Sequence, residues 1–171
     1  MISTIEPVYS QCLDELKVTG IHARSLGEYA EKVVQIVKER INFLFVGIAL
    51  LEPNLLVRFY KGAGSKYYQR RMNMNIKLSN PICIVIRNGS PLVDDNEEFF
   101  NNPDILDEKI RFYLPLQCPK GRFGAIEISA AYKLDKDSTA RTVTNLEILS
   151  SEIASTCVKL MNESEIGFWK D

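Results

Sequence analysis

The sequence predicts an α+β domain in which helices pack on the faces of an antiparallel sheet. Two observations carry this prediction. Residues 43–60 and 110–129 each read as two strands joined by a tight turn. Residues 25–40 and 135–162 carry apolar side chains at helical spacing. Strands that come as hairpins pair antiparallel, and the long helices then have a sheet to cover.

Two helices are predicted ahead of the first strand. The first covers residues 7–18, and Gly20 is expected to break it. The second covers residues 25–40, where Ser25 and Glu28 match a capping box, in which each side chain satisfies a backbone N–H at the helix start. Each helix has one apolar face to bury.

Short elements fill the middle of the chain. Residues 43–51 and 55–60 are predicted to pair as the first hairpin. The pieces that follow are an irregular stretch at 61–75, a strand at 76–78, a helix or strand at 82–86, a strand at 92–93 and an acidic stretch at 94–108. The last helix is expected to begin at Asp135–Ser138 and to end near residue 162.

The hairpin at residues 110–129 is the centre of the predicted sheet. Its first strand alternates between two faces. One face holds Ile110, Phe112, Leu114 and Leu116, and the other holds Arg111, Tyr113 and Pro115. Because Arg111 and Tyr113 share a face, both can point at one ligand and supply polar groups in an apolar wall.

Composition and charge exclude several functions. The chain has 171 residues and a formal net charge of −1. No apolar run reaches the roughly 20 residues that span a bilayer. We therefore expect no specific nucleic-acid binding and no membrane insertion. The first residues lack the basic and apolar regions of a signal peptide, so a cytoplasmic protein is expected.

The cysteines and the single histidine form no pattern of metal ligands. Cys12, Cys83, Cys118 and Cys157 contain no CxxC pair, and His22 stands near only one of them. No metal site is expected, and the four cysteines are interpreted as free thiols that are mostly buried.

Residues 26–161 resemble a GAF domain, a sensory fold related to PAS. The segment from Lys77 to Asp95 resembles the short helix, Gly-x-Pro turn and strand of that family. The strand Arg111-Phe-Tyr-Leu-Pro-Leu116 resembles its proline-containing strand, and Gly121-Arg-Phe-Gly-Ala-Ile-Glu-Ile128 resembles the strand that follows. Leu134-Asp-Lys-Asp137, ahead of a long amphipathic helix, resembles its C-terminal end.

The resemblance implies a six-stranded antiparallel sheet with the terminal helices on one face and a ligand pocket on the other. It divides the chain into a helical extension at 1–20, a GAF-like domain at 21–162 and a tail at 163–171. The pocket is expected between the sheet and residues 64–109. Its candidate lining residues are Phe45, Tyr67, Ile84, Val93, Arg111 and Tyr113.

Two charged segments border the expected pocket. Residues 61–77 carry only basic charges, among them Lys66, Arg70 and Arg71, whereas residues 94–108 carry only acidic charges. One interpretation is a basic lip that attracts an anionic ligand. The other is a pair of solvated loops, in which exposed ion pairs contribute about 0–1 kcal/mol each.

The resemblance implies a sensory or regulatory module that is not an enzyme and that acts through a partner protein. An unidentified small molecule is the expected ligand, and no cofactor is assigned. Two alternatives stay open. One is a thiol enzyme similar to the free methionine sulfoxide reductases, whose cysteines on the middle segment attack the sulfoxide; Cys83 falls near one such position. The other is a ligand-free GAF scaffold that binds partner proteins.

Surplus apolar surface on the last helix predicts a homodimer. The stripe on this helix includes Leu146, Leu149, Ile153 and Leu160. One domain of this size can cover one such face with its sheet, and the helix at residues 7–18 adds a further apolar face. GAF domains that resemble this chain often dimerise through these helices. The alternative is a monomer in which the first helix folds back onto the last one.

Overall fold

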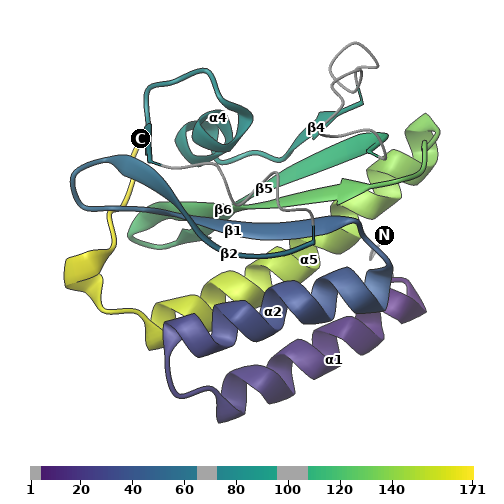
Figure 1. Cartoon of the computed structure of the whole chain (residues 1–171), viewed down its shortest axis with the longest axis horizontal. Coiled ribbons are helices and arrows are strands. Elements are labelled where there is room, and N and C mark those ends of the chain that lie inside the picture. Colours follow the sequence, from purple (N-terminus) through teal and green to yellow (C-terminus); the bar gives the residue numbers. More distant parts are fainter. Residues whose placement is uncertain (1–4, 65–72, 96–107) are drawn as a thin grey trace.

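The computed structural model describes residues 5–64, 73–95 and 108–171 (Figure 1). Its helices are α1 (Pro7–His22), α2 (Leu26–Ile41), α4 (Pro81–Asn88) and α5 (Lys136–Leu160), followed by a short 3-10 helix, η3 (Glu163–Glu165). Its strands are β1 (Phe45–Leu51), β2 (Leu56–Gly64), β3 (Met74–Asn75), β4 (Leu92–Asp94), β5 (Ile110–Cys118) and β6 (Gly121–Ala130). The fold is α+β, as the sequence predicts.

The strands of the described residues form one six-stranded antiparallel sheet in the order β3-β2-β1-β6-β5-β4. The hairpins β1–β2 and β5–β6 lie side by side because β1 pairs with β6 along most of its length. The long strands therefore occupy the middle of the sheet, and the two shortest strands form its edges. Short edge strands expose little unpaired backbone to a second chain.

Helices α1, α2 and α5 lie on one face of the sheet, which we call the helix face (Figure 1). α2 and α5 pack against the strands, and α1 packs against both of these helices. From β5, Ile110, Phe112 and Leu114 point into this core, and each is 1% exposed. Burying a side chain of this size contributes about 1.5–3 kcal/mol. Because the larger of the two buried apolar clusters lies on the helix face, this face holds most of the hydrophobic stabilisation.

Helix α4 lies on the other face, which we call the α4 face (Figure 1). The residues at 82–86, which the sequence left open between helix and strand, are helical. The Asn80 side chain accepts a hydrogen bond from the Ile82 N–H at 3.0 Å, which caps the first turn. Gly89, with a φ of 72°, ends the helix in left-handed backbone that glycine adopts without strain.

The segment that follows α5 returns along the side of the sheet to α4 (Figure 1). Its Trp169 exchanges two backbone hydrogen bonds with Arg122 of β6, at 2.8 and 3.0 Å. The Arg122 guanidinium donates to the carbonyl oxygens of Ile86 and Arg87 at the end of α4, and it pairs with Asp171 at 2.7 Å. One buried arginine thus connects the C-terminal segment, the sheet and α4.

Three element boundaries differ from the predicted ones. α1 continues through Gly20, where a Cβ would lie 3.0 Å from the Thr156 side chain of α5. The close approach of two helices at this glycine offsets its low helix propensity. β2 extends to Gly64 along its partner β1, and β3 is formed by Met74–Asn75 instead of residues 76–78.

Candidate functional site

Charged and polar side chains are buried on the α4 face at the middle of the sheet. Arg111 and Tyr113 of β5 point to this face and are 0% and 1% exposed. On β6, Ser129 and Glu127 pair with them in register and are 0% and 3% exposed. Glu108, just before β5, is 4% exposed. We call these five residues the buried polar cluster.

An ion pair lies within the buried polar cluster. The Arg111 Nε donates to the Glu108 Oε2 at 2.6 Å. Burial raises the pKa of Glu108, and the neighbouring Arg111 opposes this rise without cancelling it. The guanidinium on β5 and the carboxyl groups before β5 and on β6 present both signs of charge at fixed positions, which is the chemistry needed to orient a small charged molecule.

A stacked pair of aromatic rings borders the buried polar cluster. Phe45 and Phe59 have ring centroids 6.4 Å apart. Glycines leave room for the rings, since a Cβ at Gly47 would lie 2.6 Å from Phe45 and one at Gly62 would lie 2.5 Å from Phe59. Gly47 pairs in register with Glu127, so the rings lie beside the carboxyl side of the cluster.

Three of the six candidate pocket residues share the α4 face, namely Phe45, Arg111 and Tyr113. Val93 does not, because it packs against the core on the helix face. Alternate residues of a strand face opposite ways, so Val93 cannot line a pocket with the other three. Ile84 is half-buried on α4 and lies outside the apolar cluster between that helix and the sheet.

The remaining pocket candidate, Tyr67, and the proposed basic lip of Lys66, Arg70 and Arg71 lie outside the described residues. The two interpretations of the charged segments therefore both stay predictions.

The candidate dimer residues belong to the chain's own core. Leu146, Leu149 and Ile153 are 1%, 2% and 2% exposed between the helices and the sheet. These three side chains therefore pack against this chain's own core, and the homodimer stays a prediction. α1 folds back onto α5 and covers the apolar face that the sequence left without a partner. Leu160 is half-buried and lines a cavity.

Cys83 is placed poorly for thiol chemistry. It is 0% exposed, and its Sγ lies 3.5 Å from the Asn75 carbonyl oxygen. Burial raises the pKa of this thiol, which keeps it in the less nucleophilic protonated form. Cys12, Cys118 and Cys157 lie in or pack against the core of the helix face, so the sheet separates Cys83 from each of them. The geometry supplies neither an exposed thiolate nor a second thiol beside it.

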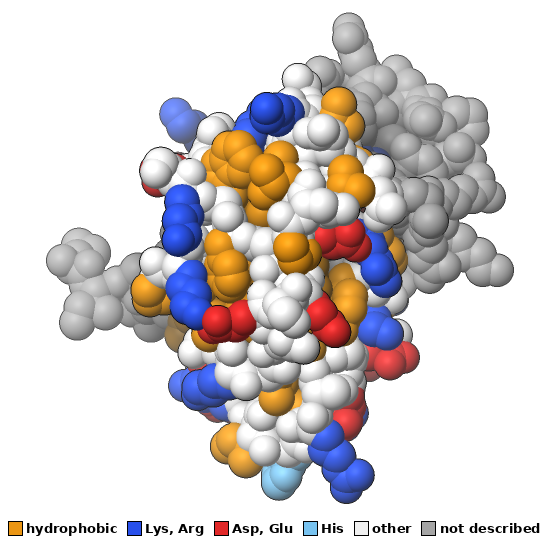
Figure 2. All heavy atoms as spheres, turned by 90° about the vertical axis from the view of Figure 1, so that its left-hand side faces the viewer, with side chains coloured by type: hydrophobic (Ala, Val, Ile, Leu, Met, Phe, Trp, Pro, Cys, Tyr) orange, Lys and Arg blue, Asp and Glu red, His pale blue; other side chains and the backbone are white. Residues whose placement is uncertain are grey.

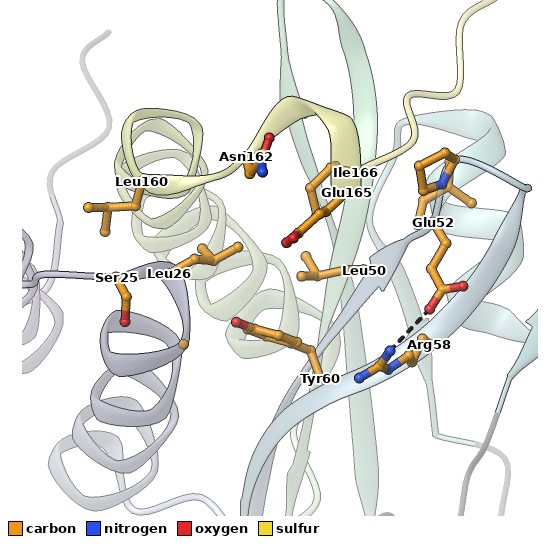
Figure 3. A pocket seen from close by; sticks show the side chains of 13 residues that line it. Ser25, Leu26, Leu50, Glu52, Arg58, Tyr60, Leu160, Asn162, Glu165 and Ile166 are labelled. Carbon is orange, nitrogen blue, oxygen red and sulfur yellow. Dashed lines mark hydrogen bonds and ion pairs between the residues drawn. The ribbon is translucent and has the colours of Figure 1, made fainter.

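A cavity of about 660 Å³ lies at one end of the helix face (Figure 3). The start of α2, the end of α5, the β1–β2 hairpin and the segment around η3 surround it. Figure 2 looks onto the end of the molecule that carries this hairpin, where hydrophobic, acidic and basic side chains alternate. Polar side chains in its lining include Tyr60, Glu165 and the ion pair Glu52–Arg58.

A β-bulge directs Tyr60 into the cavity. The register of β1 and β2 shifts between Ile48 and Ala49, which leaves Tyr60 as the extra residue of β2. The hydroxyl of Tyr60 and the carboxylate of Glu165 both point into the cavity (Figure 3). Burial raises the pKa of Tyr60, so its hydroxyl is protonated at neutral pH. No sequence signal marks this bulge, which is why the sequence did not predict the cavity.

Within residues 5–64, 73–95 and 108–171, no group of three or more His, Cys, Asp or Glu side chains is placed to hold a metal ion. None of the helices in these ranges is long and apolar enough to cross a membrane.

Comparison with known proteins finds similarity in structure and not in sequence. No protein-family model and no curated protein sequence matches the chain. The nlh2 GAF domain of A. aeolicus superimposes with a TM-score of 0.71 at 14% identity, over 87% of this chain and 94% of that one. The free methionine-R-sulfoxide reductase of Neisseria meningitidis superimposes with a TM-score of 0.72 at 11% identity, over 92% and 94%. The GAF domain of an Acinetobacter phosphoenolpyruvate-protein phosphotransferase gives 0.70 at 10%, over 91% and 95%.

These comparisons correct one inference. The resemblance to GAF domains was expected to imply that the chain is not an enzyme, and this inference is wrong. Free methionine-R-sulfoxide reductases from three organisms are enzymes and share the fold. Fold alone does not decide between a sensory domain and an enzyme. What the sheet order, the helices on its faces and these structural neighbours do show together is that this chain has the fold of a GAF domain.

Proposed function

We propose that this chain is a sensory GAF domain that binds a small zwitterionic molecule at the buried polar cluster and passes the signal to a partner protein. The observation that carries the proposal is the burial of opposite charges at the start of β5 and on its neighbour β6. Arg111, Glu108 and Glu127 are all 4% exposed or less, on one face. A molecule with both a carboxylate and an ammonium group complements such a set.

Stability alone does not explain the cluster. Each buried charge costs several kcal/mol of desolvation, and apolar replacement of a buried ion pair is often neutral or stabilising, by about 1–4 kcal/mol. The neighbouring strand positions on the helix face are apolar, which shows that this sheet accommodates apolar residues readily. Charged groups that are buried at such a cost gather at functional sites.

The structural neighbours support a role in binding small molecules. The structures of the reductases from Neisseria meningitidis and Staphylococcus aureus were solved in complex with substrate. The same fold serves as the GAF domain of phosphoenolpyruvate-protein phosphotransferases. A fold that holds a substrate in one protein and is one domain of a phosphotransferase in another is compatible with ligand-controlled contact to a partner.

The test compares the wild type with the double variant Arg111→Met/Glu108→Leu, which replaces the ion pair by apolar side chains of similar size. The twenty L-amino acids serve as probes in thermal unfolding, and native mass spectrometry of the purified protein detects any molecule that co-purifies. A ligand at one hundred times its Kd stabilises by about 2.7 kcal/mol, which raises Tm by about 5–10 °C. We expect such a rise in the wild type only, with the double variant folded and at least as stable.

Two outcomes contradict the proposal. If no probe raises Tm and no molecule co-purifies with the wild type, the cluster does not bind zwitterions. If the double variant is strongly destabilised, the ion pair is needed to stabilise the folded state and its burial is no evidence for a binding site. The single variant Arg111→Met is the control, because it leaves Glu108 buried without its arginine and is expected to lose about 3–5 kcal/mol.

A further inference from the structure

The cavity at the end of the helix face lies on the opposite side of the sheet from the buried polar cluster, so a molecule bound there is a second ligand. Its volume of about 660 Å³ is within the range of about 300–1,000 Å³ found for small-molecule sites. Leu26, Leu50 and Ile166 line it and supply an apolar wall (Figure 3). We propose that this cavity binds a small organic amine with an apolar body.

The charged side chains of the lining favour a cation. They are Glu52, Arg58 and Glu165. Arg58 Nη1 lies 3.3 Å from Glu52 Oε1, so these two charges offset each other. Glu165 forms no ion pair with any residue in the described ranges. The Glu165 carboxylate is therefore the negative charge in the lining that can interact with a ligand.

The helix ends do not change this sign. The start of α2 and the end of α5 both border the cavity, through Ser25 and Leu160. A helix start carries about +0.5 of a unit charge and a helix end about −0.5, so the two contributions offset each other. The full charge of the Glu165 carboxylate therefore decides which ligands are attracted.

The geometry also fits an ammonium group. The Glu165 carboxylate and the Tyr60 hydroxyl point into the space between Leu26 and Leu50 (Figure 3). An ammonium has three donors and can donate to both oxygens while its apolar body lies against the leucines. Lys61 is not among the residues that line the cavity. Its Nζ lies 5.7 Å from the centroid of the Tyr60 ring.

The test uses three probes that share one aromatic body: phenethylamine, which is a cation, L-phenylalanine, a zwitterion, and 3-phenylpropionate, an anion. Two-dimensional ¹H–¹⁵N NMR follows each titration of the full chain. We expect phenethylamine to shift the amide signals of Gly27, Tyr60 and Glu165 with the lowest Kd. We expect phenylalanine to bind these residues more weakly and phenylpropionate not to shift them.

The variant Glu165→Gln removes the charge and keeps the shape of the side chain. Because exposed ion pairs are weak, we expect about two- to five-fold weaker binding of phenethylamine. Glu163→Gln is the matched control: it lies in the same 3-10 turn, pairs with Lys120 and does not line the cavity, so it is expected to leave the affinity unchanged.

The proposal is overturned if phenylpropionate or phenylalanine binds these residues as tightly as phenethylamine, or if Glu165→Gln and Glu163→Gln behave alike. A lysine side chain of a partner protein carries the same ammonium group, so Nα-acetyl-lysine methylamide is titrated as well. Tighter binding of this compound than of phenethylamine also overturns the proposal, since it assigns the cavity to a protein partner. Signals at the buried polar cluster are followed in parallel, which separates this site from the proposed zwitterion site.

Discussion

The two faces of the sheet bury different chemistry. The helix face is apolar almost throughout, from Val33 of α2 through Phe112 of β5 to Leu149 of α5. The α4 face buries a smaller apolar cluster around Val85 beside charged groups such as Arg111. Neighbouring residues of the same strands supply both environments, because side chains alternate along a strand. We infer that the helix face holds the fold together and leaves the α4 face free to carry polar groups.

The largest expected effect tests the helix face. Phe112→Ala removes a ring that is 1% exposed, and we expect the free energy of unfolding to fall by about 3–5 kcal/mol. Chemical denaturation measures this loss. Phe168→Ala is the control, since Phe168 is half-buried at the edge of the same core and is expected to cost less. An equal loss in both variants contradicts the idea that this core is concentrated at the middle of the sheet.

The next effect tests the contact between the two hairpins. A Cβ at Gly124 would lie 2.4 Å from the backbone oxygen of Ala49, an atom that no side-chain rotation can move. We expect Gly124→Ala to lower the free energy of unfolding by about 1–3 kcal/mol in the same assay. In Gly27→Ala the added Cβ meets only the Tyr60 hydroxyl, at 3.2 Å, and alanine favours a helix, so this control is expected to be neutral or stabilising.

Local patterns predicted the elements and the faces of the central strand. Alternation along β5 separated Arg111 and Tyr113 from Phe112, and the structure places them on opposite faces. The helix start signals also hold: the Ser25 Oγ accepts from the Glu28 N–H at 3.1 Å, and Asp135 caps α5. These features are decided by residues close in sequence, so the sequence alone was sufficient for them.

Features that depend on distant contacts were not predictable in the same way. The stripe of Leu146, Leu149 and Ile153 showed that one face of α5 is buried, but periodicity does not say what buries it. The surplus apolar surface of α5 predicts a second chain as its cover, whereas the sheet and α1 of the same chain cover this face. The bulge at Tyr60 depends on the register of two strands, and the docking of Trp169 depends on Arg122 of β6.

A smaller effect tests how α4 is held on its face. Asn80→Ala removes the side-chain cap from the Ile82 N–H, and we expect a loss of about 1 kcal/mol. Hydrogen exchange should show faster exchange within α4 and unchanged exchange on the helix face. Asn80→Asp keeps an acceptor oxygen at this position and is expected to preserve protection. Faster exchange in α2 or α5 would mean that the two faces are not independent.

The smallest expected effect is a change in how stability depends on pH. Because burial raises the pKa of Glu108 above the ordinary value for glutamate, the folded chain binds this proton more tightly than the unfolded chain does. Folding then takes up a proton at pH values between the two pKa values. Stability therefore falls as pH rises through this window, and the lost part is regained as pH falls. Glu108→Gln cannot titrate and should lack this contribution.

The measurement is the difference in free energy of unfolding between the wild type and Glu108→Gln from pH 4 to pH 8, with the exposed Glu31→Gln as a control for general charge effects. Burial and the arginine act on Glu108 in opposite directions, so the sign of the slope shows which one prevails. If the wild type loses stability relative to Glu108→Gln as pH rises, desolvation prevails. The ionised Glu108 on the α4 face then lowers the stability of the fold. If it gains stability instead, the attraction of Arg111 at 2.6 Å prevails, and the ion pair is a structural feature like the apolar core on the helix face.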